Sequence, residues 1–326
     1  MSPVTAPTET EYDHDIVIVG GGPAGCSAGV FTAREGLDTV IFDRGRSSIQ
    51  RCAFLENYLG FPQGIDIETF YKLIQDHAET AGCEIVPDLV ESVDQLDDGE
   101  GFTITIQERN PVTARRVIAA TRYDGSYLRG LDSDEAMIET VDHDGEKDER
   151  FDRDYPDDDG STPVEGLYVA SPAGKPDKQA ILAAGRGARV GKRVVADARI
   201  ADGWWESVAE GVDWVRQQSE LDDEWADREN WIEWFDDHYG EDAPVDPESD
   251  RFERIRAASI DDSLSSYITD EQISERAAAG HEAVASRLDP EAIVAAVDSE
   301  QLLAAIDDDA IRAYREKQPQ FEREAQ

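Results

Sequence analysis

The sequence predicts an α/β fold: a Rossmann-type domain, with a parallel sheet and a small β-meander, followed by an acidic α-helical C-terminal region. Three observations support this prediction. Near the N-terminus, a glycine-rich motif stands between a buried strand and a helix. A second apolar strand follows and ends in a carboxylate. From about residue 203 onward the chain combines helical apolar patterns with many acidic residues.

The first of these features runs from a strand at residues 15–19 into a glycine loop. The strand is β-branched and has no charge after its first residue, which is typical of a buried parallel strand. Gly20-Gly21-Gly22-Pro23-Ala24-Gly25 then forms a G-x-G-x-x-G motif, followed by a helix-compatible segment at 26–34. The first glycine of such a motif allows a tight turn, the second lets the backbone approach a diphosphate, and the third lets the helix pack on the strand. The start of the helix adds unpaired N–H groups and a partial positive charge.

The second strand, at residues 39–42, is followed at once by Asp43, 23 residues after Gly20. A carboxylate at this distance is expected to bind the ribose hydroxyls of adenosine. A lone G-x-G-x-x-G can also be a structural turn in an unrelated βαβ unit. The strand before it, the helix after it and the acidic residue together favour a dinucleotide site.

The composition points to a protein that functions in high salt. The chain of 326 residues is long enough for two domains and carries 73 acidic against 31 basic residues, a net charge of −42. The acidic residues are spread over the whole length, whereas a surface for one basic partner would show a localised patch. So much like charge repels itself unless salt screens it, as in the cytoplasm of an extreme halophile. Nucleic acid and anionic membranes are unsuitable partners for such a surface.

The cysteines and the hydropathy exclude several other classes. Cys26, Cys52 and Cys83 form no C-x-x-C and have no metal-type spacing, so we expect neither a disulfide framework nor a metal site. No apolar run is long enough to span a membrane, and residues 1–15 contain no signal-peptide core. The sequence therefore predicts a soluble, cytoplasmic protein.

The rest of the first domain is predicted from local patterns. Residues 66–81 are expected to form a helix and residues 83–86 a third short strand. Residues 89–106 and 114–121 are expected to form a small β-meander that closes with a buried strand.

At this point the motifs resemble a known family. GGGPAG, the acidic residue after the second strand, ENYLGFPQGI at 56–65 and VIAAT at 117–121 occur in order. They are followed by EGLYVAS at 165–171 and QAILAAGRGA at 179–188. This series resembles the flavin domain of the thioredoxin-reductase branch of the pyridine-nucleotide disulfide oxidoreductases. The resemblance implies an FAD-binding domain formed by residues 12–122 and 165–199.

The resemblance also implies which residues bind FAD. The glycine loop would hold the diphosphate, Asp43 the adenosine ribose and Val86 the adenine surroundings, while Asn57 and a helix start near Gln179 would face the isoalloxazine. The complete expected set is Gly20, Gly22, Pro23, Ala24, Gly25, Asp43, Asn57, Val86, Ala120, Thr121, Lys178, Gln179 and Ala180.

The chain departs from that family in several places. Members insert a nicotinamide-binding domain, usually with a redox C-x-x-C, where this chain has only residues 123–164, predicted to be an acidic connecting loop. Arg122 stands where a glycine usually follows Ala-Thr, and Ser171-Pro172 replaces a Gly-Asp pair whose aspartate contacts the ribityl chain. Gly185-x-Gly187-x-x-x-Gly191 could be taken for a second nucleotide loop, but a helical run precedes it, which favours helix packing.

The sequence pattern identifies no catalytic residue. Cys52 is a candidate because it lies five residues before Asn57 and follows Arg51, whose charge favours a thiolate. The alternative is a small buried residue without chemistry. None of the five histidines falls in a catalytic motif.

The region from residue 200 to 326 is expected to be helical. All six tryptophans lie between Trp204 and Trp234. Trp204, Val208, Val212 and Val215 are predicted to share one helical face. The rings are interpreted as anchors of a helical core, with one ring over the flavin as the alternative. Near the end, residues 289–297 are echoed by 298–306, and 307–314 resembles a third copy. Each is expected to be a short helix that opens with an aspartate cap, and the second is expected to be capped by Asp298 or Ser299.

Two function classes follow. One is an FAD-dependent oxidoreductase without its own nicotinamide domain, acting on a small molecule or with an electron-carrier protein, and compatible with a homodimer. The alternative is a non-catalytic flavin- or nucleotide-binding protein with a sensing or scaffold role.

Overall fold

The structure, a computed structural model, describes residues 12–324 except for 46, 98, 123–124, 144–145, 172–178, 212–215, 217–224 and 241–242. The chain divides into two units, Met1–Asp270 and Glu271–Gln326, which are described separately.

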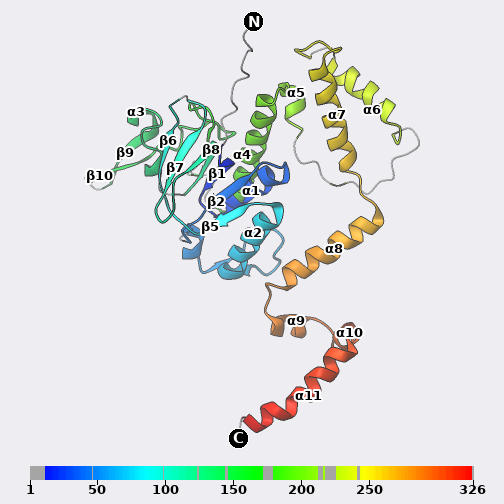
Figure 1. Ribbon diagram of the computed structural model, residues 1–326. Coiled ribbons are helices and arrows are strands. Elements are labelled where there is room, and N and C mark those ends of the chain that lie inside the picture. The colour runs from blue at the N-terminus through cyan, green and yellow to red at the C-terminus, as the bar shows by residue number, and fades with distance from the viewer. Residues whose placement is uncertain are drawn as a thin grey trace. The chain divides into compact units, whose positions relative to one another are not determined.

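A mixed sheet forms the centre of the first unit (Figure 1). Its strands follow the order β5-β2-β1-β8-β7-β6, and β11 also pairs with β8. The strands β5, β2, β1, β8 and β11 are parallel, whereas β6 and β7 run antiparallel to their neighbours. This arrangement confirms the predicted α/β class with its meander. The bounds are β1 His14–Val19, β2 Thr39–Phe42, β5 Glu84–Val86, β6 Val90–Gln95, β7 Phe102–Ile106, β8 Val112–Ala120 and β11 Leu167–Ser171.

Strand β8 joins the two parts of the sheet. Its residues 112–114 pair with β7 of the meander, and its residues 117–120 pair with β11. Its other side pairs with β1 from Ala114 to Ala119. One long strand therefore brings the segment at 167–171 back beside the N-terminal βαβ unit, as the resemblance predicts.

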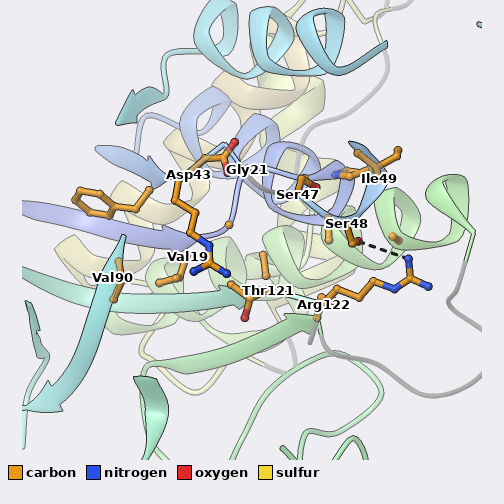
Figure 2. A pocket seen from close by; sticks show the side chains of 18 of the residues that line it. Val19, Gly21, Asp43, Ser47, Ser48, Ile49, Val90, Thr121 and Arg122 are labelled. Carbon is orange, nitrogen blue, oxygen red and sulfur yellow. Dashed lines mark hydrogen bonds between the residues drawn. The ribbon is translucent and has the colours of Figure 1, made fainter. Parts of the chain in front are cut away.

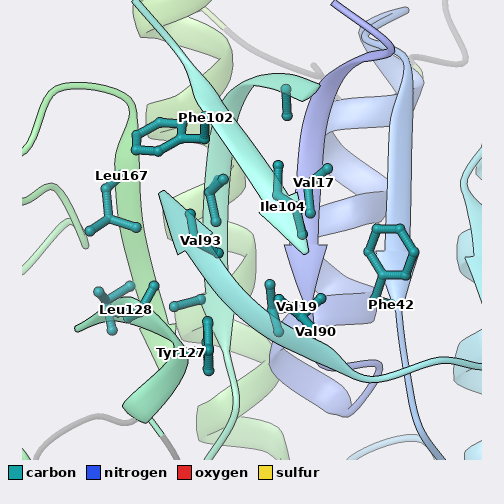
Figure 3. Close-up of a cluster of buried hydrophobic side chains, with 14 of the residues drawn as sticks. Val17, Val19, Phe42, Val90, Val93, Phe102, Ile104, Tyr127, Leu128 and Leu167 are labelled. Atoms are coloured by element: carbon teal, nitrogen blue, oxygen red, sulfur yellow. The ribbon is translucent and has the colours of Figure 1, made fainter. Parts of the chain in front are cut away.

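Both faces of β1 are buried, which explains its uninterrupted apolar sequence. Val17 and Val19 face the meander and pack with residues such as Phe102 and Leu167 (Figure 3). Ile16 and Ile18 face the opposite side and pack against helices. The helices of the domain are α1 Pro23–Arg34, α2 Ile67–Ala81 and α4 Ala180–Ala201.

Helices α1 and α4 pack closely through small residues. A Cβ at Gly187 would collide with the backbone oxygen of Ala24, and one at Gly191 would lie 2.8 Å from the oxygen of Ala28. Gly185, in contrast, has no atom within 4 Å of the position where a Cβ would stand. Gly187 and Gly191 therefore serve helix packing, as predicted, whereas Gly185 does not.

The acidic segment at 123–164 is not simply a solvated loop, and in this respect the prediction was wrong. It contains the 3-10 helix η2 Ser126–Leu128, helix α3 Asp134–Met137 and a hairpin of β9 Ile138–His143 with β10 Glu146–Phe151. Leu128, Met137 and Phe151 are buried in the same cluster as the meander. These few apolar side chains anchor the segment, although charged residues dominate its composition.

The tryptophans belong to a helical core of their own. It involves α5 Glu206–Ala209, α6 Arg228–Phe235 and α7 Asp250–Ser265, with a π-helical turn at Asp236–Gly240. The ring of Trp205 stacks on Phe252 with centroids 5.5 Å apart. The predicted continuous helical face was wrong in part, because α4 ends at residue 201 and α5 begins at residue 206; Val212 and Val215 lie outside the described residues. The buried members are Trp205, Val208, Trp231, Phe235, Phe252, Ile255 and Ile260.

Arg199, in the last turn of α4, connects this helical core to the α/β domain. One of its Nη atoms lies 2.5 Å from Glu35, beside the end of α1, and 2.8 Å from Asp262 in α7. Its guanidinium also lies 4.7 Å from the centre of the Trp204 ring. Arg199 is largely buried, with 14% of its side chain exposed.

Replacing Arg199 with alanine is therefore expected to lower the free energy of unfolding by about 2 kcal/mol, because two partly buried ion pairs and a cation–π contact are lost. Tryptophan emission and far-UV circular dichroism during denaturation would measure this effect. Arg312→Ala is the control, since its ion pair with Asp309 is exposed and contributes little. Equal stability of the two variants would contradict the linking role of Arg199.

The second unit consists of helices, several of which begin at an aspartate cap. Its elements are α8 Asp270–Ala285, α9 Pro290–Ala296, α10 Ser299–Ala305 and α11 Asp308–Glu324. Asp289 accepts a hydrogen bond from the backbone N–H of residue 291, and Asp298 does so from those of 300 and 301. Asp307 caps the start of α11 in the same way. The first two predicted tandem helices are thus present, and Asp298 rather than Ser299 caps the second. The third copy was predicted to be a short helix at 307–314, which was wrong, because α11 continues to residue 324.

Candidate functional site

A cavity of about 510 Å³ opens at the carboxyl ends of β1, β2 and β8 (Figure 2). It lies where the strand order turns, because β1 has β2 on one side and β8 on the other. This is the place where open α/β sheets bind ligands. The predicted residues that line the cavity are Gly20, Gly22, Pro23, Ala24, Asp43, Cys52, Ala120, Thr121, Gln179 and Ala180.

The glycine loop forms the floor of the cavity. Gly20 has a φ of 111°, and a Cβ there would lie 2.8 Å from the oxygen of Ala120. A Cβ at Gly25 would collide with the oxygen of Gly20, so this residue packs the helix onto the strand and does not line the cavity. Gly22 is the N-cap of α1, whose first turn contains no acidic residue. The N-terminus of α1 therefore faces the cavity with its partial positive charge uncompensated by a carboxylate in that turn.

Asp43 is held in place by side chains that sequence reasoning missed. Its Oδ2 accepts hydrogen bonds from the hydroxyl of Tyr71 and from Nε2 of Gln75 (3.1 Å), and its Oδ1 accepts one from the backbone N–H of Gly45 (3.1 Å). A carboxylate can accept about four hydrogen bonds, so one position remains for a ribose hydroxyl. Burial, and then the nearby Asp43 carboxylate, raise the pKa of Tyr71, so the phenol stays a donor. Tyr71 and Gln75 lie four positions apart on α2, so they share one side of the helix. This polar pair beside the apolar face is the sequence feature from which their contact with Asp43 could have been inferred.

The other end of the cavity joins segments that are far apart in the sequence. The side-chain amide of Asn57 donates to Oε1 of Gln179 at 2.9 Å. Gln179 is the N-cap of α4, so the first backbone N–H groups of that helix lie at this end, as predicted. Lys178 lies outside the described residues. Val86 is buried and does not line the cavity, but its carbonyl accepts a hydrogen bond from the backbone N–H of Asp43 at 2.9 Å.

The two departures from the family motif also lie at the cavity. Arg122 lines it, and its Nη1 is 3.5 Å from Oγ of Ser48. Ser171 lines it as well, whereas Pro172 lies outside the described residues. None of the described tryptophans lines the cavity, so the alternative of a ring over the flavin gains no support from them; Trp214 lies outside the described residues. Among the described residues, no cluster of side chains suited to a metal ion is present.

The three cysteines differ in exposure. Cys52 is exposed and lines the cavity, so its interpretation as a small buried residue was wrong. Cys26 and Cys83 are buried. Burial raises the pKa of both thiols, that of Cys83 to about 12. Neither buried thiol is therefore a nucleophile at neutral pH.

We expect a thiol reagent such as iodoacetamide to alkylate Cys52 alone in the folded protein, and bound FAD to slow the reaction because Cys52 lines the cavity. Peptide mass spectrometry after labelling at pH 8 measures both effects. A Cys52→Ser variant serves as the control and should remain unlabelled. Labelling of Cys26 or Cys83 at a rate similar to that of Cys52 would contradict this account.

Together, the parallel sheet, the glycine loop and the cavity define a dinucleotide-binding domain of Rossmann type. Residues 14–140 match the family model described as pyridine nucleotide-disulphide oxidoreductase. This match agrees with the family resemblance for that part of the chain, which is less than half of its length.

Two sequence relatives and one solved structure are similar to parts of this chain. NADPH-dependent thioredoxin reductase 3 of Arabidopsis thaliana is 31% identical over 134 residues, or 39% of this chain and 25% of the relative. Thioredoxin reductase of Streptomyces coelicolor is 32% identical over 129 residues, 38% of each chain. A solved thioredoxin reductase from Gloeobacter violaceus aligns with a TM-score of 0.48 at 17% identity, covering 63% of this chain and 98% of that one. The chain thus spans between a quarter and two fifths of the length of these two sequence relatives.

No helix among the described residues is long and apolar enough to cross a membrane.

Proposed function

We propose that the chain is an FAD-dependent oxidoreductase related to thioredoxin reductase that uses an electron donor other than a built-in nicotinamide domain. Residues 12–122 and 165–199 form its FAD-binding domain, and residues 123–164 connect the two parts in place of the NAD(P)H domain. Residues 200–326 form the helical region. We further propose that it works in a cytoplasm of high salt, with a small molecule or an electron-carrier protein as its partner.

One observation carries this proposal more than any other. A single cavity is lined both by residues expected at the diphosphate and the adenosine ribose of FAD, Gly22 and Asp43, and by those expected at the flavin end, Gln179 and Ala180. These groups come from segments separated by more than a hundred residues. A structural glycine turn would need no such second segment, so the arrangement supports a dinucleotide that extends from one end to the other.

The residues present fit FAD in chemical terms. The start of α1 suits the diphosphate, and Asp43 retains an acceptor position for a ribose hydroxyl. The N–H groups at the start of α4 would stabilise negative charge beside Gln179. When bound, FAD supplies electron and hydride transfer, and the protein supplies placement and electrostatics.

The proposal is tested by reducing the reconstituted protein. The purified chain is loaded with FAD in molar salt, and the visible flavin absorbance is followed without oxygen while NADPH, NADH or small organic donors are added. Loss of this absorbance with one of the donors supports an oxidoreductase. Dithionite serves as the control that the bound flavin can be reduced.

Bound FAD that only dithionite reduces would instead favour the non-catalytic binding role. A folded chain that binds no FAD would contradict the oxidoreductase, and one that binds neither FAD nor ADP would contradict both roles. Thioredoxin reductase activity is not expected, because the sequence contains no C-x-x-C. Disulfide-dependent NADPH oxidation by the isolated chain would overturn that expectation.

A further inference from the structure

Arg122 occupies a position at the cavity where the family motif usually has glycine. Strand β8 ends at Ala120, and Thr121 and Arg122 follow it. The backbone of Arg122 therefore lies on the side of the cavity that the central sheet forms. Its side chain reaches toward the segment that follows β2, where Nη1 lies 3.5 Å from Oγ of Ser48 (Figure 2). Arg122 thus extends between two walls of the cavity.

The loop that Arg122 reaches lies against the start of α1. Oγ of Ser47, the residue next to Ser48, lies 2.9 Å from the position that a Cβ on Gly22 would occupy. Gly22 is the N-cap of α1. Ser48 therefore holds the guanidinium in the neighbourhood of the helix terminus that suits a diphosphate.

The cavity is lined by charged side chains of both signs. The carboxylates of Asp43, Asp88 and Glu91 line it, and so do the guanidinium groups of Arg44, Arg51 and Arg122. The chain as a whole has a net charge of −42, so the cations at the cavity favour the binding of an anionic ligand. The terminus of α1 offers roughly half of a positive charge, whereas the diphosphate of a dinucleotide carries about two negative ones. An arginine is suited to this task because its planar guanidinium can donate two parallel hydrogen bonds to phosphate oxygens.

We propose that Arg122 binds the diphosphate of the cofactor together with the start of α1, and that its contact with Ser48 holds the guanidinium in position. This inference rests on the proposed function, because it concerns the same cavity. It assigns a binding role to a residue that stands where the family motif has no side chain.

The test compares ligands that do and do not carry a diphosphate. Equilibrium affinities of FAD, ADP, adenosine and riboflavin are measured at constant salt for the wild type and for R122Q and R122K. R129Q is the matched control, since it removes the same charge from a residue outside the cavity that pairs with Glu149. Far-UV circular dichroism and thermal unfolding of each variant establish that it is folded.

For R122Q we expect the affinities of both FAD and ADP to fall roughly tenfold to a hundredfold, the loss typical of a hydrogen bond to a charged group. Adenosine and riboflavin should bind R122Q as they bind the wild type. R122K should retain part of the affinity, and R129Q all of it.

Unchanged binding of FAD and ADP by folded R122Q would overturn the inference and leave the proposed function intact. Weaker FAD binding with unchanged ADP binding would also overturn it, because the contact would then be with the flavin half. If the wild type binds neither FAD nor ADP, the proposed function itself fails, and the inference fails with it.

Discussion

Replacing Gly187 with alanine is expected to lower the free energy of unfolding by about 2 kcal/mol and to weaken cofactor binding. The added Cβ would collide with the backbone oxygen of Ala24, and backbone cannot yield as a flexible side chain can. Overpacking of this kind costs about 1–3 kcal/mol or more, against a gain in helix propensity of about 1 kcal/mol. Because α1 carries the N-terminus at the cavity floor, moving it away from α4 also disturbs the expected diphosphate site.

Gly185 offers a matched control two residues earlier in the same helix. It is exposed, and a Cβ there meets no atom within 4 Å. Gly185→Ala should therefore stabilise the protein by up to about 1 kcal/mol, since only the helix propensity changes. Urea denaturation in molar salt measures both variants. If the two substitutions shift stability in the same direction, the close packing of α4 on α1 is contradicted.

Replacing Asp43 with alanine is expected to lower the affinity for FAD by about a hundredfold. The substitution removes the acceptor for the adenosine ribose, and a hydrogen bond to a charged group contributes about 1.5–3 kcal/mol. It also takes from Tyr71 and Gln75 the carboxylate to which both donate. Quenching of flavin fluorescence on binding measures the affinity.

Two further variants distinguish the loss of the ribose contact from the effect of removing a negative charge anywhere on the protein. Tyr71→Phe keeps the carboxylate but removes one of the groups that orient it, so a smaller loss, of about tenfold, is expected. Asp94→Ala removes the same charge from an exposed position on β6 and should leave the affinity unchanged. An Asp43→Ala variant that binds FAD as tightly as the wild type would exclude Asp43 as the ribose ligand.

Much of the fold could be predicted because its signals are local. The uninterrupted apolar run of β1, the glycine loop and the Asp66 cap of α2 each determine their own element from a few neighbouring residues. The hairpin of β9 and β10 could not be predicted in this way. Its anchoring residues, such as Met137 and Phe151, are few among many charges, and their burial depends on the distant meander.

In the candidate site, too, the features set by neighbouring residues were predicted, and those that depend on distant contacts were not. The glycine loop and Asp43 were found from spacing, and the structure brings them to one cavity. The hydrogen bonds of Tyr71 and Gln75 to Asp43 join residues about thirty positions apart. That contact depends on how α2 packs beside β2, which no local pattern specifies. The exposure of Cys52 likewise follows from the position of its loop at the cavity.

The central claim is that this cavity holds one FAD molecule with its diphosphate at the start of α1. Equilibrium dialysis of the folded chain against FAD in molar salt, with ADP as competitor, tests it most directly. The account predicts saturation at one FAD per chain and its displacement by ADP. A folded chain that retains no FAD, or retains it without competition from ADP, would contradict the claim.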